Sequence, residues 1–362
     1  MLIYYSLYAL LISAAVLKTA FAESVAAKRN YCIFSFLLIS LILALRHPSM
    51  GVDLQYGGSN GYLGMFGIIS ESSWDSVFHN KFLNYEKGYV VFCKLIGCIS
   101  GEQQTILIFC AFISIGAISY LIYKYSENPL LSYSIFLGLP VFLLNYSGLR
   151  QVIAIAITAV SYVLIRNKKP LLFVLAVLLA ASFHRSAIFF LIAYPVYYFK
   201  QMSRLRLFTV AALPAVYLLR SPLFSVLSRL FKDDAVPDNN FAITLFIIFC
   251  AVYAFNAVYS DKNDVHGEGL MNMFWLACFC QAFSGVYSTA IRVGYYFMVY
   301  LILLLPKTLS SIKNNADDNR KTYAVFTMII FVCFSAFGLY SIYASKASWA
   351  MANPYHFFWQ VI

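Results

Sequence analysis

Two arginines stand at the starts of long apolar runs. Arg150 follows a Ser-Gly turn and lies at the beginning of the run 149–166, and Arg292 begins the run 292–306. A helix amino end and a guanidinium group together favour anions, because free backbone N–H groups and the cation attract the same charge. Two such positions suit a diphosphate better than a monophosphate. The alternative is that each arginine contacts the phosphates of lipid head groups.

A polar break interrupts the apolar stretch 171–199 at His184 and Arg185. The stretch is too short for two full membrane crossings joined by a long turn, since one crossing needs about 20 residues. We therefore expect the break below the membrane surface, in a cavity or against protein, where ionisable groups are usually functional. An imidazole can exchange a proton near neutral pH. The alternative for His184 is a simple hydrogen bond to a backbone carbonyl.

Glu86 and Asp53 are the carboxylates best placed for acid–base chemistry. Glu86 directly precedes an apolar segment that favours a helix, and Asp53 lies two residues after Gly51. Both residues also have ordinary explanations. The helix dipole stabilises an acidic residue at a helix start, and aspartate is common in turns.

Several motifs of catalysis are missing from the sequence. It contains no Walker loop, no H-E-x-x-H, no G-x-S-x-G and no D-x-D pattern. We therefore expect no metal site and no cofactor. The 8 cysteines lie mostly inside apolar runs and none forms a C-x-x-C pair, so we interpret them as small core residues.

The composition decides which elements must position these residues. Of 362 residues, 62% are hydrophobic and only 11% are charged, against roughly 25% charged residues in a soluble domain. So few charges cannot cover a water-soluble surface, which excludes a soluble enzyme, a disordered chain and a nucleic-acid binder. The net charge of +11 is explained by basic cytoplasmic loops. The composition predicts an all-α polytopic membrane protein.

The apolar runs predict about 10–12 transmembrane helices in a single integral membrane domain over residues 1–362. Residues 2–22 end in Ala-Phe-Ala, as a cleaved signal does, but no basic residue precedes Lys18, so we interpret them as the first span. Residues 86–100 suit a short interfacial or re-entrant helix. The other runs lie at about 31–45, 104–124, 130–145, 149–166, 171–183, 186–199, 205–220, 241–259, 270–287, 292–306 and 323–343.

The linkers between these runs divide by charge. The short basic linkers are 23–30, 166–170, 200–206 and 307–322, and they fall on alternate connections. The positive-inside tendency places them in the cytoplasm. The long segment 46–103, the segment 221–240 and both termini then lie outside. The candidate site residues fall on that same outer side.

The order of these residues resembles the EpsG family, which groups with the Wzy-type O-antigen and capsular polysaccharide polymerases. The resemblance covers nearly the whole chain, and its Leu-Arg-Gln and Phe-His-x-Ser-Ala elements are the most specific. The matching elements are Arg46, Gly51-x-Asp53-x-x-Tyr56, Glu86-x-Gly88-Tyr89, Leu149-Arg150-Gln151, Phe183-His184-x-Ser186-Ala187, Arg292-x-x-Tyr295 and Pro354-Tyr355.

The resemblance implies a GT-C-like glycosyltransferase of the bacterial inner membrane, with its active site facing the periplasm. The growing glycan would move from undecaprenyl diphosphate onto a new lipid-linked repeat unit. The implied partners are these lipid-linked oligosaccharides, the lipid bilayer, and a chain-length regulator and flippase of the same pathway. No nucleic acid is expected.

The resemblance also implies roles for individual residues. Glu86 is favoured as the base that activates the acceptor hydroxyl, because a carboxylate repels the diphosphate and should lie on the acceptor side. Asp53 is its substitute, and His184 is a ligand of the diphosphate or of the acceptor sugar. The residues expected to bind diphosphate or sugar are Arg46, Arg150, Gln151, Arg185, Arg292, Tyr295 and Tyr355.

Two other functions stay open at this point. A flippase for lipid-linked oligosaccharides should show internal repeats and charges at the middle of the membrane, and the sequence shows neither. A membrane acyltransferase is the third possibility, which an assay with an external acyl acceptor would distinguish.

Overall fold

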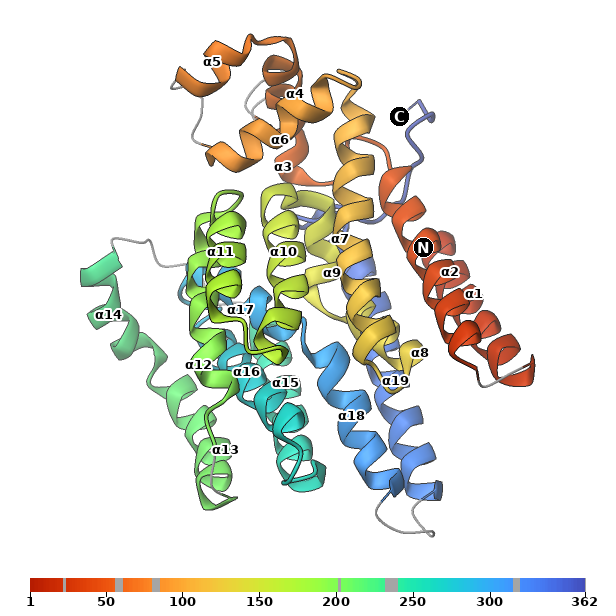
Figure 1. The fold of residues 1–362 in the computed structure, drawn as a ribbon, viewed down its shortest axis with the longest axis vertical. Coiled ribbons are helices and arrows are strands. Elements are labelled where there is room, and N and C mark those ends of the chain that lie inside the picture. Colours follow the sequence, from red (N-terminus) through yellow and green to blue (C-terminus); the bar gives the residue numbers. More distant parts are fainter. Residues whose placement is uncertain are drawn as a thin grey trace.

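The computed structural model describes residues 1–21, 24–55, 61–79, 85–200, 203–231, 240–314 and 320–361 (Figure 1). These residues form helices joined by turns, with no β-strand among them. A helix satisfies its backbone N–H and C=O groups within its own segment, which is required where water is absent. The structure is therefore that of an all-α polytopic membrane protein, as the composition predicts.

Within the described residues, five helices are long and apolar enough to cross a membrane. Two bent helix pairs raise the number to seven when each pair is counted as one span. The first pair is α8 (Pro129–Gly138) with α9 (Pro140–Ser147), bent by 60°, and the second is α17 (Ser288–Met298) with α18 (Leu301–Asn314), bent by 43°. The five single helices are α2 (Val25–Ala44), α7 (Gln103–Tyr125), α10 (Leu149–Arg166), α15 (Asn240–Tyr259) and α19 (Arg320–Ala344).

Shorter helices occupy the remaining apolar runs. Four of them have apolar parts of only 10–17 residues, and the expected number of about 10–12 spans is reached when three or all four of these also cross. They are α1 (Leu2–Phe21), α11 (Pro170–Ala181), η2 (Arg185–Ile192) continued by α12 (Ala193–Tyr197), and α13 (Ser203–Leu218). The described helices also include α14 (Arg220–Phe231) and α16 (Val265–Ala282).

Close packing between helices forms one large apolar core through the bundle. Helices α8 and α19 approach each other at two glycines. A β-carbon on Gly138 would lie 2.6 Å from the Phe334 carbonyl oxygen, and one on Gly338 would lie 2.8 Å from that of Leu137. Glycines allow such close backbone contact between membrane helices, where van der Waals packing drives association.

The segment 46–103 differs from the expected loop with one short helix. It forms four short helices at one end of the bundle (Figure 1): α3 (Val52–Gln55), α4 (Tyr62–Glu71), α5 (Trp74–His79) and α6 (Lys87–Gly97). They share a second apolar core with α7 and α10, which includes Phe66, Val90 and Leu149. The expected short helix is present as α6, and its place at the membrane interface stays a prediction. The Tyr56 of the motif lies outside the described residues.

The second expected loop, 221–240, also needs correction. Helix α14 covers residues Arg220–Phe231, and residues 232–239 lie outside the described part of the chain. The apolar residues Leu223, Phe224 and Leu227 follow helical spacing, which explains why this segment is not an open loop.

The two ends of the bundle carry different parts of the chain. At the end with α3–α6, the amino-terminal ammonium lies 3.5 Å from Asn353 Oδ1 and Arg46 pairs with Phe357, so both terminal segments meet there. At the other end, Lys28 Nζ donates to the Ser126 carbonyl and Lys307 forms a 2.6 Å ion pair with Asp264. The basic linkers thus share one end, as their charge predicts, while the membrane side of each end stays a prediction.

Candidate functional site

A polar cavity of about 290 Å³ lies at the bundle end that carries α3–α6. Its lining comes from α3, α4, α9, α10, α17 and the segments at residues 184 and 349. Six of the ten predicted site residues line it: Asp53, Arg150, Gln151, His184, Arg292 and Tyr295. Tyr62, Leu144, Gly148, Ile291 and Trp349 complete the lining.

Arg150 is held in place from three sides. It is the second residue of α10, which confirms the predicted position in the first helical turn. Its Nη1 lies 2.6 Å from Glu86 Oε2, its Nε donates to the Tyr62 hydroxyl at 3.0 Å, and its guanidinium carbon lies 4.6 Å from the Tyr85 ring centre. A guanidinium fixed in this way keeps further N–H donors for an anion in the cavity.

Glu86 does not line the cavity, although it was the favoured base. It precedes α6, and both of its carboxylate oxygens are engaged: Oε2 accepts from Arg150 and Oε1 accepts from the Arg185 backbone N–H at 3.1 Å. Burial by itself raises the pKa of the carboxyl group, but the Arg150 charge and these hydrogen bonds outweigh it, so the pKa of Glu86 lies below its usual value. Glu86 therefore suits the positioning of Arg150 better than proton removal.

His184 precedes η2 and lines the cavity. Its Nδ1 lies 2.7 Å from Ser186 Oγ and 3.4 Å from the Tyr296 hydroxyl, and these two hydroxyls are 3.2 Å apart. The expected alternative, a bond to a backbone carbonyl, is replaced by this hydroxyl pair. Burial lowers the pKa of His184 to about 4, with the Glu86 charge opposing this shift and the Arg150 and Arg292 charges adding to it. The imidazole is therefore neutral at pH 7 and offers Nε2 to a ligand.

Arg292 lies in the second turn of α17, which begins at Ser288, and not at the helix start as predicted. Its side chain is exposed, and within the described part of the chain its guanidinium has no hydrogen-bond or ion-pair partner. Gln151 Nε2 donates to the Arg292 carbonyl at 2.7 Å, which fixes α17 against α10. Tyr295, one turn further, is buried with its ring against the cavity.

Asp53 is the carboxylate that faces the cavity. It is exposed, its carboxylate has no partner among the described residues, and its backbone N–H donates to Ser147 Oγ at 3.1 Å. The turn before it depends on Gly51, whose φ of +112° lies in the region that favours glycine. A β-carbon on Gly51 would lie 1.9 Å from the Tyr146 carbonyl oxygen.

Trp349 and Tyr62 line the cavity but are absent from the sequence prediction. The Trp349 carbonyl accepts a 3.1 Å hydrogen bond from the Val52 N–H, so the carboxyl-terminal segment lies beside α3. The sequence gives only a weak indication that Trp349 belongs to the site. This residue follows the last apolar run, where an aromatic residue also fits a membrane-interface belt.

Three predicted ligands lie outside the cavity lining. Arg46 is 1% exposed, and it donates to the carbonyls of Leu43 and Asn145. The Tyr355 hydroxyl donates to the Ile42 carbonyl at 2.7 Å. Both side chains thus connect parts of the scaffold. Arg185 is exposed, and its backbone N–H donates to Glu86 Oε1.

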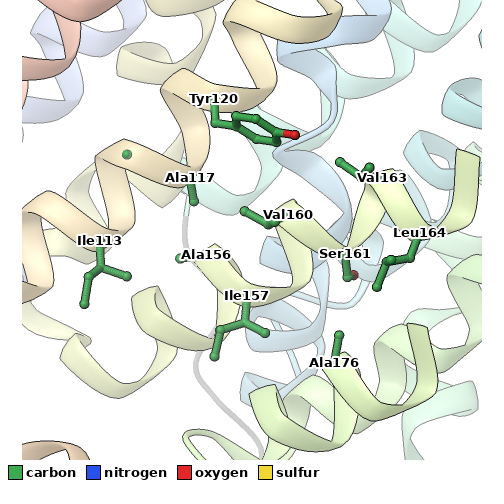
Figure 2. Close-up of a pocket in the computed structure, with 11 residues that line it drawn as sticks. Ile113, Ala117, Tyr120, Ala156, Ile157, Val160, Ser161, Val163, Leu164 and Ala176 are labelled. Atoms are coloured by element: carbon green, nitrogen blue, oxygen red, sulfur yellow. The ribbon is translucent and has the colours of Figure 1, made fainter. Parts of the chain in front are cut away.

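A larger hollow lies elsewhere in the structure and is apolar. This groove of about 650 Å³ runs along α7, α10 and α11, with Ile157 and Val160 on its floor and Ala117, Tyr120 and Ala176 beside them (Figure 2). It carries no acid or base, so it has the character of a surface that accepts hydrocarbon chains. Among the described residues, no group of three or more His, Cys, Asp or Glu side chains could hold a metal ion.

Comparison with known proteins gives a family and no individual relative. The EpsG family matches residues 29–357, which is most of the chain and includes every residue of the cavity. No curated protein and no solved structure matches the chain. EpsG is a family of Wzy-type polymerase-like membrane proteins. The chain belongs to the EpsG family.

Proposed function

We propose that this protein is a polysaccharide polymerase that transfers a growing glycan from undecaprenyl diphosphate onto the terminal sugar of a lipid-linked repeat unit. Membership of the EpsG family suggests a polysaccharide polymerase-like function. The cavity adds the chemistry that such a transfer needs: cationic groups for a diphosphate, a free carboxylate for a hydroxyl proton, and a position at one end of a membrane bundle.

The observation that carries the proposal is the convergence of Arg150, Arg292 and His184 on one cavity. Guanidinium groups match phosphate oxygens with parallel hydrogen bonds, and a preorganised cation stabilises charge that develops on a leaving group. Arg150 is fixed by Glu86 and Tyr62, whereas Arg292 is exposed and has no partner among the residues that the structure describes. We assign the bound diphosphate to both, with the neutral His184 as a further hydrogen-bond partner.

The base of the proposed reaction is Asp53. Its carboxylate faces the cavity and meets no partner in the described part of the chain, while the two oxygens of Glu86 are already engaged. In the reaction, the acceptor hydroxyl oxygen forms a bond to the anomeric carbon of the donor, and the bond from that carbon to the diphosphate oxygen breaks. The hydroxyl proton passes to Asp53, and the diphosphate leaves with the bonding electron pair beside Arg150 and Arg292.

Lysine substitutions test the diphosphate assignment. Arg150→Lys and Arg292→Lys each keep the positive charge but lose the two-pronged geometry. We expect polymerisation by the purified enzyme to fall on the order of 10-fold or more for each variant, with protein abundance unchanged. A full-length polysaccharide ladder from both variants would favour contact with lipid head groups instead.

A deletion strain tests the class of function. Loss of a polymerase leaves single repeat units on the surface lipid, because transport across the membrane continues. Loss of a flippase leaves none. The proposed function is wrong if the deletion strain carries no repeat units at all and a plasmid copy of the gene restores them.

A further inference from the structure

We infer that the cavity contains a separate subsite for the acceptor sugar, formed by the Trp349 indole and the Asp53 carboxylate, with a pyranose ring as its ligand. This inference rests on the proposed function and adds to it the part of the site that recognises the acceptor. It assigns a role to Trp349, which neither the motif nor the family comparison singles out.

Trp349 is presented to the cavity on a fixed backbone. The segment after the short helix η4 (Ser345–Ala347) is anchored by two buried alanines, Ala350 and Ala352, which are both 0% exposed. The Ala352 N–H donates to Ser345 Oγ at 3.0 Å, and the Trp349 carbonyl accepts from Val52. The indole itself is 40% exposed. A rigid backbone with an accessible ring is the arrangement of a binding platform.

The same hydrogen bond brings the backbone of α3, which carries Asp53, beside the backbone of Trp349. Val52 donates to the Trp349 carbonyl, and Asp53 is the following residue in α3. Ser147 Oγ accepts from the Asp53 N–H, so α3 is held from a second side. A carboxylate and an aromatic face therefore enter the cavity from adjacent backbone positions.

The charged side chains of the cavity lining come from different elements. The cations Arg150 and Arg292 come from α10 and α17, while Asp53 and Trp349 come from α3 and the carboxyl-terminal segment. A diphosphate is attracted to the two arginines and repelled by the Asp53 carboxylate. A sugar ring suits Asp53 and Trp349, because its hydroxyls donate to a carboxylate and its C–H face packs against an aromatic ring.

The other aromatic rings of the lining do not offer such a face. Tyr62 is 7% exposed and its hydroxyl accepts from Arg150, and Tyr295 is 8% exposed. Trp349 is therefore the aromatic side chain of the lining with substantial open surface. A membrane-interface belt would also expose a tryptophan, so the test must separate sugar binding from anchoring.

The experiment uses the full chain in nanodiscs and two probes. The first probe is the repeat-unit oligosaccharide released from its lipid, and the second is undecaprenyl diphosphate without sugar. Binding of each is measured by titration for the wild type, Trp349→Ala, Trp349→Phe and Trp359→Ala. Trp359 is the matched control, because it lies in the same segment, is 59% exposed and is absent from the cavity lining.

We expect Trp349→Ala to weaken oligosaccharide binding on the order of 10-fold, the loss typical of a stacked aromatic, while undecaprenyl diphosphate binds as before. Trp349→Phe should recover most of the affinity, and Trp359→Ala should match the wild type. Equal weakening of both probes in Trp349→Ala, or unchanged oligosaccharide binding, overturns the subsite.

Failure of the subsite is distinguishable from failure of the proposed function. If the wild type binds both probes and polymerises, but Trp349→Ala does so equally well, only the subsite is wrong. If the wild type binds neither probe and forms no polymer, the proposed polymerase is wrong and the subsite with it.

Discussion

At the scale of single residues, two carboxylates near the cavity differ in what their oxygens already bind. Glu86 is paired with Arg150, while the Asp53 carboxylate faces the cavity and has no partner within the described ranges of the chain. A free carboxylate can accept a proton from a hydroxyl, whereas a paired one orients its partner. The two residues should therefore respond differently to the same chemical change.

We expect Asp53→Asn to lower turnover on the order of 10²- to 10⁴-fold, the contribution of a positioned base, with donor affinity intact. Glu86→Gln should lower turnover less, on the order of 10- to 100-fold, because Arg150 loses part of its orientation. Donor affinity should not fall in Glu86→Gln, since the charge of Arg150 is then unpaired. Kinetic assays with lipid-linked repeat units measure turnover and donor affinity for both variants. If Asp53→Asn has normal turnover and Glu86→Gln has none, Glu86 and not Asp53 is the base.

The low pKa of His184 predicts a flat pH response. Burial lowers this pKa from 6.5 to about 4, so the imidazole stays neutral from pH 5.5 to 8 and turnover should show no step near pH 6.5. At a pH between about 4, the folded-state pKa, and 6.5, the unfolded-state pKa, His184 binds a proton in the unfolded chain but not in the folded chain. The free energy of unfolding therefore decreases as the pH falls from 6.5 to about 4. A pH–rate profile that steps near 6.5 in the wild type and not in His184→Gln would contradict this.

Residue positions in the site were predictable where a polar residue interrupts an apolar run. Arg150, His184 and Arg292 stand out in this way, and all three line the cavity. The Glu86–Arg150 pair spans 64 residues, and no local pattern shows which distant charge a side chain meets. For the same reason, the sequence does not show that Arg46 is a buried structural residue and not a substrate-binding one.

At the scale of elements, the turn before α3 decides where Asp53 lies. Gly51 combines a φ of +112° with close contact to the Tyr146 carbonyl. Gly51→Ala should displace α3 and abolish polymerisation. It should also lower the thermal midpoint by several degrees, which is the shift expected from about 1–3 kcal/mol of backbone strain.

Gly67 provides the control for that substitution. It lies within α4 in the same segment, and a β-carbon there would meet nothing within 4 Å. Gly67→Ala should be neutral or stabilise the protein by up to about 1 kcal/mol. Equal thermal midpoints and equal activities of the two variants would show that the turn at Gly51 does not determine the position of α3.

The apolar runs predicted where most helices lie, and their breaks were harder to foresee. Pro140 marks the bend between α8 and α9 in the sequence. No glycine or proline lies between Met298 and Leu301, so the local sequence does not predict the bend before α18. The helices α3 to α5 are short, and packing on α7 and α10 rather than their own sequence stabilises them.

At the scale of the whole molecule, the distribution of charge predicts its orientation. The basic linkers share one end of the bundle, and the cavity lies at the other. Reporter fusions after Lys169 and Arg206 should therefore score cytoplasmic, and fusions at Lys81 and Lys232 periplasmic. A cytoplasmic score at Lys81 would place the cavity on the wrong side for a periplasmic polymerase.

The meeting of distant chain segments at the cavity also has a consequence for biosynthesis. The Tyr4 hydroxyl donates to the Ala352 carbonyl, 348 residues further along, and Trp349 joins α3 through Val52. A chain emerging from the ribosome inserts its early helices long before residue 349 exists. The nascent protein must therefore stay in the membrane with an incomplete cavity, and the proposed activity requires that the segment around Trp349 has docked.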